Sequence, residues 1–434
     1  MSYFLETAVS RAQRSGSRRA YLRVSAVLFC LAWCCPATAG ETLAPLTVRE
    51  ALDRALASSP AVRAAELRLR GGEAHLRGAR SAPNPELTLQ HGVGNNTGGL
   101  DEDLVVSQLF ELGGKRRFRT LAASGEQQRA AAELDAARLE LAYQVRVAYL
   151  AAQEGQALRD QAAQFVRLAE RFRDAAKAQF EAGEVPRTQV IRSEIEVAAR
   201  EQVRDEATAE LETRLTTLKS LVGIPYPTSV AVAPDLAAPA VEPALETWRT
   251  LAGARPEVQA ARWEIAARQA AVRAARAIRV PDLFVAGTHA RLDQWPRNSV
   301  RAGFTFAFLD RGALRAQRDE AQALASASEA ELQERIRTVE QELQTAYDQL
   351  LRATGRLQRY RSGQLERVRE LTELAQTGYE AGLTSYLEVL DAQRIQNEAQ
   401  AGYTRALADA ARARLALERA AGSPQLLATG EQPK

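Results

Sequence analysis

The chain has almost none of the residues from which metal and thiol sites are built. Its 434 residues include only 3 His, 1 Met and 3 Cys, and all three cysteines lie within the first 35 positions. This shortage disfavours most metalloenzymes and enzymes with a cysteine nucleophile. No nucleophile, base and orienting group stand at a recognisable catalytic spacing either, so we expect no enzymatic activity and no cofactor.

Charge of one sign and long apolar runs are also scarce. The 57 Lys and Arg residues nearly balance the 54 Asp and Glu residues, for a net charge of +3. A nucleic-acid binder would carry a concentrated basic surface, so this class is disfavoured. After residue 39, no run approaches the roughly 18 apolar residues that a membrane-spanning helix requires.

Residues 1–39 are predicted to be a secretory signal peptide. Five arginines precede an apolar run from Val24 to Trp33, and Ala37-Thr38-Ala39 supplies the small residues of a cleavage site. Cleavage would remove every cysteine, so the mature chain could form no disulfide, and its net charge would be −1.

Two alternatives for the export route stay open. The pair Arg18-Arg19 resembles a twin-arginine signal, although an arginine-rich leader explains it equally well. Lipidation would need cleavage just before Cys34 or Cys35, and the bulky Trp33 disfavours it because a small residue is wanted there.

The rest of the chain is a tandem duplication of a unit of about 200 residues. Residues 60–85 align with residues 256–281 at an offset of 196, with nine identities in 26 positions. The offset is 198 where Ala148-Tyr149 matches Ala346-Tyr347. It is 199 where Phe180-Glu181-Ala182-Gly183 matches Tyr379-Glu380-Ala381-Gly382. The copies are far longer than the 20 to 50 residues of solenoid repeats, so we expect a pseudo-symmetric pair.

The duplication sets the domain boundaries that we predict. They are a first repeat at 46–225, a Pro-rich connector at 226–243, a second repeat at 244–424 and a tail at 425–434. Five prolines between Pro225 and Pro243 exclude a continuous helix in the connector.

Long helices are expected to dominate both copies. Leu332, Ile336, Val339, Leu343, Ala346 and Leu350 keep the 4-3-4 spacing of a coiled-coil seam. Proline is absent between Gly114 and Gly183, and again between Gly312 and Gly382. A single helix over either stretch would approach about 100 Å, although two stacked helices remain an alternative.

One hairpin in each copy interrupts the helical pattern, at about 85–112 and about 281–309. The strands alternate apolar and polar residues over 9 to 11 positions, the length of a tilted membrane-spanning strand. The alternative, a small soluble hairpin on a coiled-coil rod, is weaker because an isolated hairpin is marginally stable in water. Four strands cannot close a barrel, whereas three chains would supply twelve and leave an open lumen.

These features together resemble the TolC family of outer-membrane efflux channels. The resemblance covers residues 46–424, and Phe110-Glu111-Leu112-Gly113-Gly114-Lys115-Arg116 is similar to the cobalt-zinc-cadmium, or CzcC-type, branch. It implies a mainly α fold with a membrane β-barrel: a homotrimer with a shared twelve-stranded barrel in the outer membrane and a helical tunnel extending into the periplasm. The implied partners are a periplasmic adaptor and an inner-membrane resistance-nodulation-division (RND) pump.

The resemblance also implies a periplasmic gate in the helix after the second tip. Its acidic residues fall on Glu388 and Asp391, which are three apart and therefore share a helix face. Three copies would place six carboxylates in two rings, a field that favours cations. The aligned residues Gln189 and Arg192 of the first copy carry no acid. The alternative is that both carboxylates are ordinary solvated charges.

The turns at the two helix tips are the predicted adaptor-docking sites. Gly183 and Gly382 are expected to end the long helices with a positive φ, and Pro186 is expected in the first turn of the returning helix. The full set is Gly183, Val185, Pro186, Arg187, Gly382, Leu383, Thr384 and Ser385.

The predicted function is a passive export duct for divalent heavy-metal cations such as cobalt, zinc and cadmium. A drug, a dye or a polypeptide exported by type I secretion is the alternative cargo, because a wide duct takes its specificity from the pump. An alternative from another class is a periplasmic coiled-coil adaptor or scaffold, although the chain has no lipoyl-like segment. His75, His91 and His289 lack ligand spacing, so we expect no metal site.

Overall fold

The computed structural model describes residues 45–92, 101–234, 236–239, 244–292, 295–305, 311–381 and 383–427. The predicted signal peptide, the tip residue Gly382 and most of the predicted tail therefore lie outside the described residues. The described part belongs to one unit that begins at Pro45.

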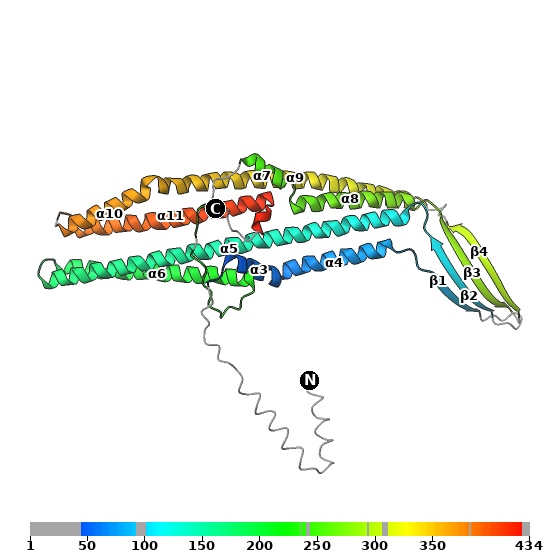
Figure 1. Cartoon of the computed structure of the whole chain (residues 1–434), viewed down its shortest axis with the longest axis horizontal. Helices are drawn as coiled ribbons and strands as arrows, with labels where there is room; N and C mark the ends of the chain where they lie inside the picture. The colour runs from blue at the N-terminus through cyan, green and yellow to red at the C-terminus, as the bar shows by residue number, and fades with distance from the viewer. Residues whose placement is uncertain are drawn as a thin grey trace, which may run out of the picture. The chain divides into compact units, whose positions relative to one another are not determined.

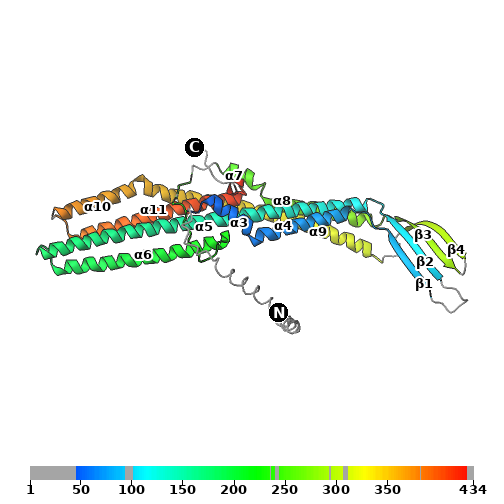
Figure 2. The same ribbon diagram turned by 60° about the horizontal axis from the view of Figure 1, so that its bottom comes forward.

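The order of elements repeats, as the duplication predicts. The first copy consists of α3 (Val48–Ser58), α4 (Pro60–Arg80), β1 (Glu86–Gly92), β2 (Asp101–Phe110), α5 (Lys115–Glu181) and α6 (Arg187–Val222). The second consists of α7 (Leu245–Ala252), α8 (Pro256–Ala277), β3 (Asp282–Leu292), β4 (Trp295–Thr305), α9 (Ala313–Arg359), a π-helical turn (Tyr360–Gln364), α10 (Leu365–Glu380) and α11 (Tyr386–Ala421). Figures 1 and 2 show the strands together at one end of the long helices and the hairpins α5–α6 and α10–α11 at the other end.

The four strands form one antiparallel sheet in the order β1-β2-β3-β4. The register places Leu87 opposite Val106, Val106 opposite Gly287, and Gly287 opposite Val300. Alternate side chains share a face, so one face of the sheet carries Leu87, Leu89, Leu104, Val106, Leu283, Val300 and Phe304. Val300 is 80% exposed and Leu89 is 75% exposed in the single chain. The predicted apolar face is therefore present, and each outer strand has one open edge within the described sheet.

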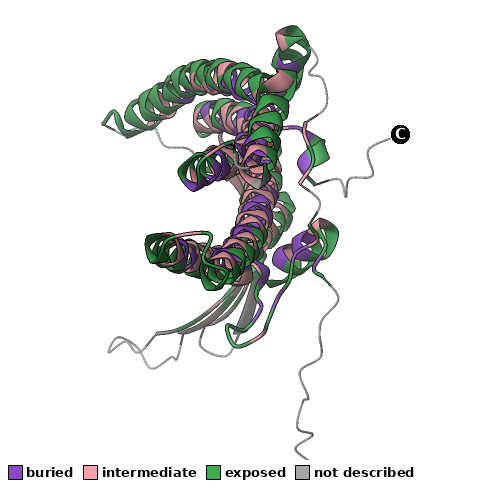
Figure 3. Cartoon of the chain, turned by 90° about the vertical axis from the view of Figure 1, so that its left-hand side faces the viewer, coloured by how far each residue is buried: buried purple, intermediate pink, exposed green. Residues whose placement is uncertain are grey.

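The cores lie in seams between the helices. The coiled-coil positions Val339, Leu343, Ala346 and Leu350 of α9 are buried against Trp248 of α7, Val258 and Leu417. In the first copy, Leu218 and Val222 of α6 are buried with Val145 and other residues of α5. Figure 3 shows the long helices of this unit in a curved row, with short helices on its convex side.

The long helix is continuous in the first copy but interrupted in the second. α5 runs for 67 residues, whereas α9 and α10 are separated by the π-helical turn, in which Gly363 has a φ of +113°. The repeat offset rises from 198 to 199 between Tyr347 and Tyr379, so the second copy has one extra residue in this stretch. A π turn accommodates one additional residue within a helix, and glycine tolerates the positive φ.

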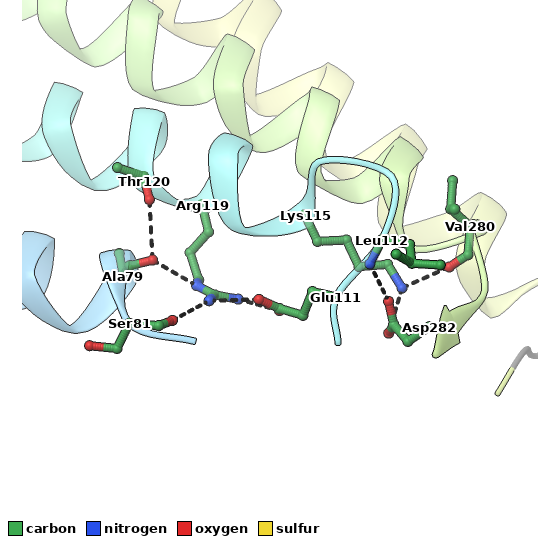
Figure 4. Close-up of polar contacts among 9 residues, drawn as sticks. All are labelled: Ala79, Ser81, Glu111, Leu112, Lys115, Arg119, Thr120, Val280 and Asp282. Atoms are coloured by element: carbon green, nitrogen blue, oxygen red, sulfur yellow. Dashed lines mark hydrogen bonds and ion pairs between the residues drawn. The ribbon is translucent and has the colours of Figure 1, made fainter. Parts of the chain in front are cut away.

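The predicted branch motif forms the joint between strand β2 and helix α5. The Lys115 ammonium donates hydrogen bonds to Asp282 Oδ2 at 2.7 Å and to the carbonyl of Val280 at 2.8 Å (Figure 4). The backbone N–H of Leu112 donates to the other carboxylate oxygen of Asp282 at 3.0 Å. The start of α5 in the first copy is thus tied to the start of β3 in the second.

A second ion pair ties the same joint to α4. Arg119 makes a bidentate contact with Glu111, at 2.6 and 3.0 Å, and also donates to the carbonyls of Ala79 and Ser81 at the end of α4 (Figure 4). Because a bidentate guanidinium–carboxylate pair fixes orientation as well as distance, it holds β2 at a defined angle to the helices.

Candidate functional site

The first-repeat tip is a tight turn between α5 and α6. Gly183 has a φ of +79°, and its N–H donates to the carbonyl of Phe180 while the N–H of Glu184 donates to the carbonyl of Gln179. Pro186 is the N-cap residue of α6, and Arg187 is the first helical residue. Pro186 therefore lies one position before the first turn in which it was expected. Gly183, Pro186 and Arg187 are exposed, and Val185 is half-buried.

The second-repeat tip joins α10 to α11 in a similar way. The N–H groups of Leu383 and Thr384 both donate to the carbonyl of Gly378. The Thr384 hydroxyl donates to the carbonyl of Ala375 at 3.0 Å. Leu383 is 84% exposed, which is unusual for a side chain of this size.

Glu388 takes part in capping α11. Its backbone N–H donates to the Ser385 hydroxyl at 3.4 Å, and its carboxylate accepts from the Ser385 N–H at 3.3 Å, which together form a capping box. The sequence Ser385-Tyr386-Leu387-Glu388 has the capping-box pattern, so this role could have been predicted from the sequence. The exposed carboxylate thus has a structural role in the single chain.

Asp391 lies one turn further along α11 and is also exposed. Its Oδ1 is 2.8 Å from the Arg394 guanidinium, which also contacts Glu398 at 3.0 Å. Glu388 and Asp391 line one side of a groove between α10 and α11, whose apolar residues include Leu371, Leu374 and Leu387. The structure brings the two predicted gate residues together on one face, beside a basic residue that the sequence analysis did not consider.

A hydrogen-bonded link between the tips was not anticipated. The Tyr379 hydroxyl of α10 accepts from the Gln189 side-chain amide at 2.7 Å and donates to Gln179 Oε1 at 3.0 Å. Gln189, which the repeat alignment marked only as the first-copy counterpart of an acid, thus connects the two copies. Arg192, the other counterpart, is exposed.

Tyr386 packs beside this link. Its ring centroid is 6.1 Å from that of Tyr379, and the residue is 7% exposed. Burial, with a smaller contribution from the Glu196 carboxylate, raises the pKa of Tyr386 to about 12. The phenol therefore stays neutral at physiological pH.

A buried carboxylate joins the repeats farther from the tips. Glu154 of α5 is 4% exposed and contacts both Arg214 of α6, at 2.8 Å, and Arg412 of α11. A buried charge needs such partners to offset its desolvation. Sequence periodicity gave no signal for this cluster, because its members are separated by 60 and 258 positions.

Two searches of the described residues complete the site. Within the described ranges, no three His, Cys, Asp or Glu side chains converge closely enough to hold a metal ion. His75 lies 3.5 Å from Glu126, and His289 contacts Asn298 at 2.6 Å. Among the helices that the structure describes, none combines the length and apolarity needed to cross a bilayer.

The sequence matches the family described as "Outer membrane efflux protein" in two segments, residues 51–224 and 249–423. The chain is 30% identical over 391 residues to the cobalt-zinc-cadmium resistance protein CzcC of Cupriavidus metallidurans, covering 88% of this chain and 91% of that protein. It is 33% identical over 219 residues to the pyoverdine export outer membrane protein OpmQ of Pseudomonas putida, covering 48% of this chain and 45% of that protein.

Solved structures show the same fold. The outer membrane protein VceC of Vibrio cholerae superposes with a TM-score of 0.72 at 19% sequence identity, over 86% of this chain and 96% of that one. At this level of identity the comparison concerns the fold alone.

The chain belongs to the outer membrane efflux protein family, also called the TolC family. It is an outer-membrane channel that extends into the periplasm, and it is not an enzyme. The predicted fold class, with two repeats and four antiparallel strands, is confirmed. Channels of this family form trimers in tripartite efflux systems. The scaffold alternative is therefore set aside.

Proposed function

We propose that this channel is the outer-membrane duct for divalent heavy-metal cations such as cobalt, zinc and cadmium. The similarity to CzcC along nearly the full length of both proteins carries this proposal. The proposed assembly is a homotrimer with a twelve-stranded barrel, joined by a periplasmic adaptor to a proton-driven RND pump. The duct itself needs no tight metal site, because an ion held strongly could not be released.

Metal sensitivity of a deletion strain tests this cargo. We expect loss of the gene to lower the tolerated concentrations of cobalt, zinc and cadmium and to raise the metal content of the cells, with both restored by the wild-type gene. An unchanged metal tolerance combined with sensitivity to dyes or retention of a siderophore would support organic cargo instead. The partial similarity to OpmQ is the observation that keeps this second candidate.

We further propose that Glu388 and Asp391 form the selective constriction of the closed channel. Both side chains are exposed on one face of α11, so threefold symmetry would give two rings of three carboxylates each. Arg394 lies beside Asp391 and offsets part of the negative charge of that ring in the single chain. The proposed gate therefore owes its cation preference chiefly to Glu388 and to the excess of acids over bases.

Single-channel recording tests the gate directly. Replacing both residues, Glu388→Ala with Asp391→Ala, should raise the conductance of the closed state and reduce its preference for cations over anions. The matched control is Glu366→Ala with Glu370→Ala, which removes two exposed carboxylates from α10. The gate assignment is wrong if the first pair leaves conductance and selectivity unchanged.

The tips are proposed as the surface on which the adaptor docks. Exposure of Gly183, Pro186, Arg187 and Leu383 supports this, and Val185, Thr384, Ser385 and the undescribed Gly382 complete the proposed set. The chain has no cysteine after position 35, so single cysteines can serve as cross-linking sites. Arg187→Cys and Leu383→Cys should cross-link to the adaptor in cells, whereas Tyr226→Cys, exposed and outside the tips, should not.

A further inference from the structure

Basic residues gather where the helices meet the strands. Helix α5 begins with Lys115, Arg116 and Arg117, and α9 has Arg315 in its first turn, while neither helix has an acid there. A cation is disfavoured at a helix N-terminus, because the unsatisfied N–H groups make that end positive. Helix energetics therefore do not explain these residues, and both copies share the pattern.

The most concentrated part of this region is a groove between α8 and α9. It is lined by Arg276 and Arg279 at the end of α8, and by Leu314, Arg318, Asp319 and Gln322 of α9. Arg318 is paired with Asp319 at 2.7 Å. Arg276, Arg279 and Arg315 are exposed, and the described residues offer none of them an ion-pair partner. We call Arg276, Arg279, Arg315 and Arg318 the basic groove.

The basic groove opens on the side of α9 that carries α7. Asp319 and Gln322 lie 18 residues, or five helical turns, before Arg337 and Glu340. Arg337 and Glu340 line a hollow between α7 and α9. Residues five turns apart point the same way, so both hollows face the same direction. The short helices lie on the convex side of the helical row, away from the concave side that would line a tunnel (Figure 3).

The groove also lies at the edge of the membrane-spanning sheet. Arg279 is three residues before β3 begins at Asp282, a separation of at most about 10 Å. β3 and β4 have 11 residues each, and strands of this length tilted by about 45° cross a band of about 25 Å, the height of the apolar belt of such barrels. Exposed Ile278, Val280 and Phe304 lie between the arginines and the strands in sequence or at the strand end.

We propose that the basic groove binds the phosphate groups of anionic phospholipids in the periplasmic leaflet of the outer membrane. Three facts meet there: guanidinium groups without acid partners, an outward-facing groove, and a position at headgroup level below an apolar sheet face. Arginine suits this role, because its fork of N–H donors matches phosphate oxygens. Bound lipid would hold the barrel at a fixed height relative to the bilayer. This proposal is independent of the cargo.

Native mass spectrometry of the full-length protein tests the proposal. The protein would be released from nanodiscs of equal parts phosphatidylglycerol and phosphatidylcholine, and the retained lipids counted. Wild type should retain phosphatidylglycerol preferentially. Each charge removed near a membrane surface weakens anionic lipid binding by about fivefold, so Arg276→Gln, Arg279→Gln and Arg315→Gln together should lower the binding constant on the order of a hundredfold.

Matched variants make the outcome specific. Arg262→Gln, Arg367→Gln and Arg369→Gln remove three exposed guanidinium groups elsewhere and should leave lipid retention unchanged. The Arg→Lys versions of the groove residues should restore most of it. Equal retention in wild type and groove variant, or equal loss in groove variant and control, overturns the proposal.

Two further outcomes identify other occupants and would also overturn it. If 10 mM inorganic phosphate, about a physiological-scale concentration, displaces the lipid completely, the groove is a site for free phosphate rather than for headgroups. If the groove variant dissociates into monomers in lipid-free detergent while the control does not, a neighbouring copy of the chain covers the groove.

Discussion

The phenol hydroxyl of Tyr379 in the second repeat accepts a hydrogen bond from the side-chain amide of Gln189 in the first, at 2.7 Å. The same hydroxyl donates to Gln179, so one tyrosine bridges both sides of the first-repeat tip. All three groups are uncharged between about pH 5 and pH 9. The contact that holds the two tips together in one chain is therefore insensitive to pH in that range.

Replacing Tyr379 with Phe should loosen the tips. The change removes two hydrogen bonds of about 1 kcal/mol each while keeping the ring, which would raise the fraction of open channels roughly tenfold or more. Single-channel recording in a planar bilayer measures this fraction. Tyr226→Phe, at a position that is 66% exposed outside the tips, is the control. Equal open fractions in wild type and Tyr379→Phe would show that the link does not hold the tips.

Removing the buried carboxylate should weaken the joint between the repeats. Glu154→Gln leaves Arg214 and Arg412 without their shared counter-charge, a loss of about 3 kcal/mol when one partner of a buried ion pair is removed. The temperature at which the oligomer dissociates on a gel should fall. Glu212→Gln, an exposed change on the same helix α6, should leave it unchanged.

Alkaline pH should destabilise the hairpin of α10 and α11 through Tyr386. Its pKa is raised to about 12 in the fold, compared with about 10 in an unfolded chain. The stabilisation is therefore complete below about pH 10 and is lost as the pH rises towards 12, a change of about 2 to 3 kcal/mol. Tyr386→Phe should flatten the decline in unfolding temperature between these pH values. If the decline is as steep in the variant, other groups cause it.

The joint between strand and helix should tolerate no side chain at Gly113. This residue has a φ of +67°, and an added Cβ would lie 2.6 Å from a methyl group of Val280. Gly113→Ala should therefore cost about 1 to 3 kcal/mol and reduce the amount of folded protein in the membrane. Adding Val280→Ala should recover part of the loss by relieving the contact but not the backbone strain. Gly71→Ala, inside α4 with open space around it, should be neutral or stabilising.

Much of this fold could be predicted because its information is periodic or repeated. The spacing of Val339, Leu343 and Leu350 shows which face of α9 is buried, and alternation shows which face of each strand is apolar. The two copies provide the duplication without any structure. Contacts between distant polar residues have no such period, so neither the Glu154 cluster nor the Tyr379 link could be inferred.

The candidate site shows the same division. The sequence located Glu388 and Asp391 on one helix face, and the Ser385-to-Glu388 pattern could have revealed the capping role as well. The ion pair with Arg394 follows from a spacing of three, but nothing in the sequence decides whether Arg394 bonds to Asp391, to Glu398 or to both. That choice depends on rotamers, which side-chain packing sets.

The π-helical turn at Tyr360–Gln364 means that the two halves of the gene differ in length by one codon within the long helix. One residue rotates everything after it by about 100° around an α-helix. An uncompensated difference would turn Tyr379 away from Gln189, whereas the π turn absorbs it and restores the facing of α10. Substitutions transferred between the copies must therefore be shifted by 198 positions before the turn and by 199 after it. A deletion of Gly363 should be read as a change of helical phase as well as a loss of flexibility.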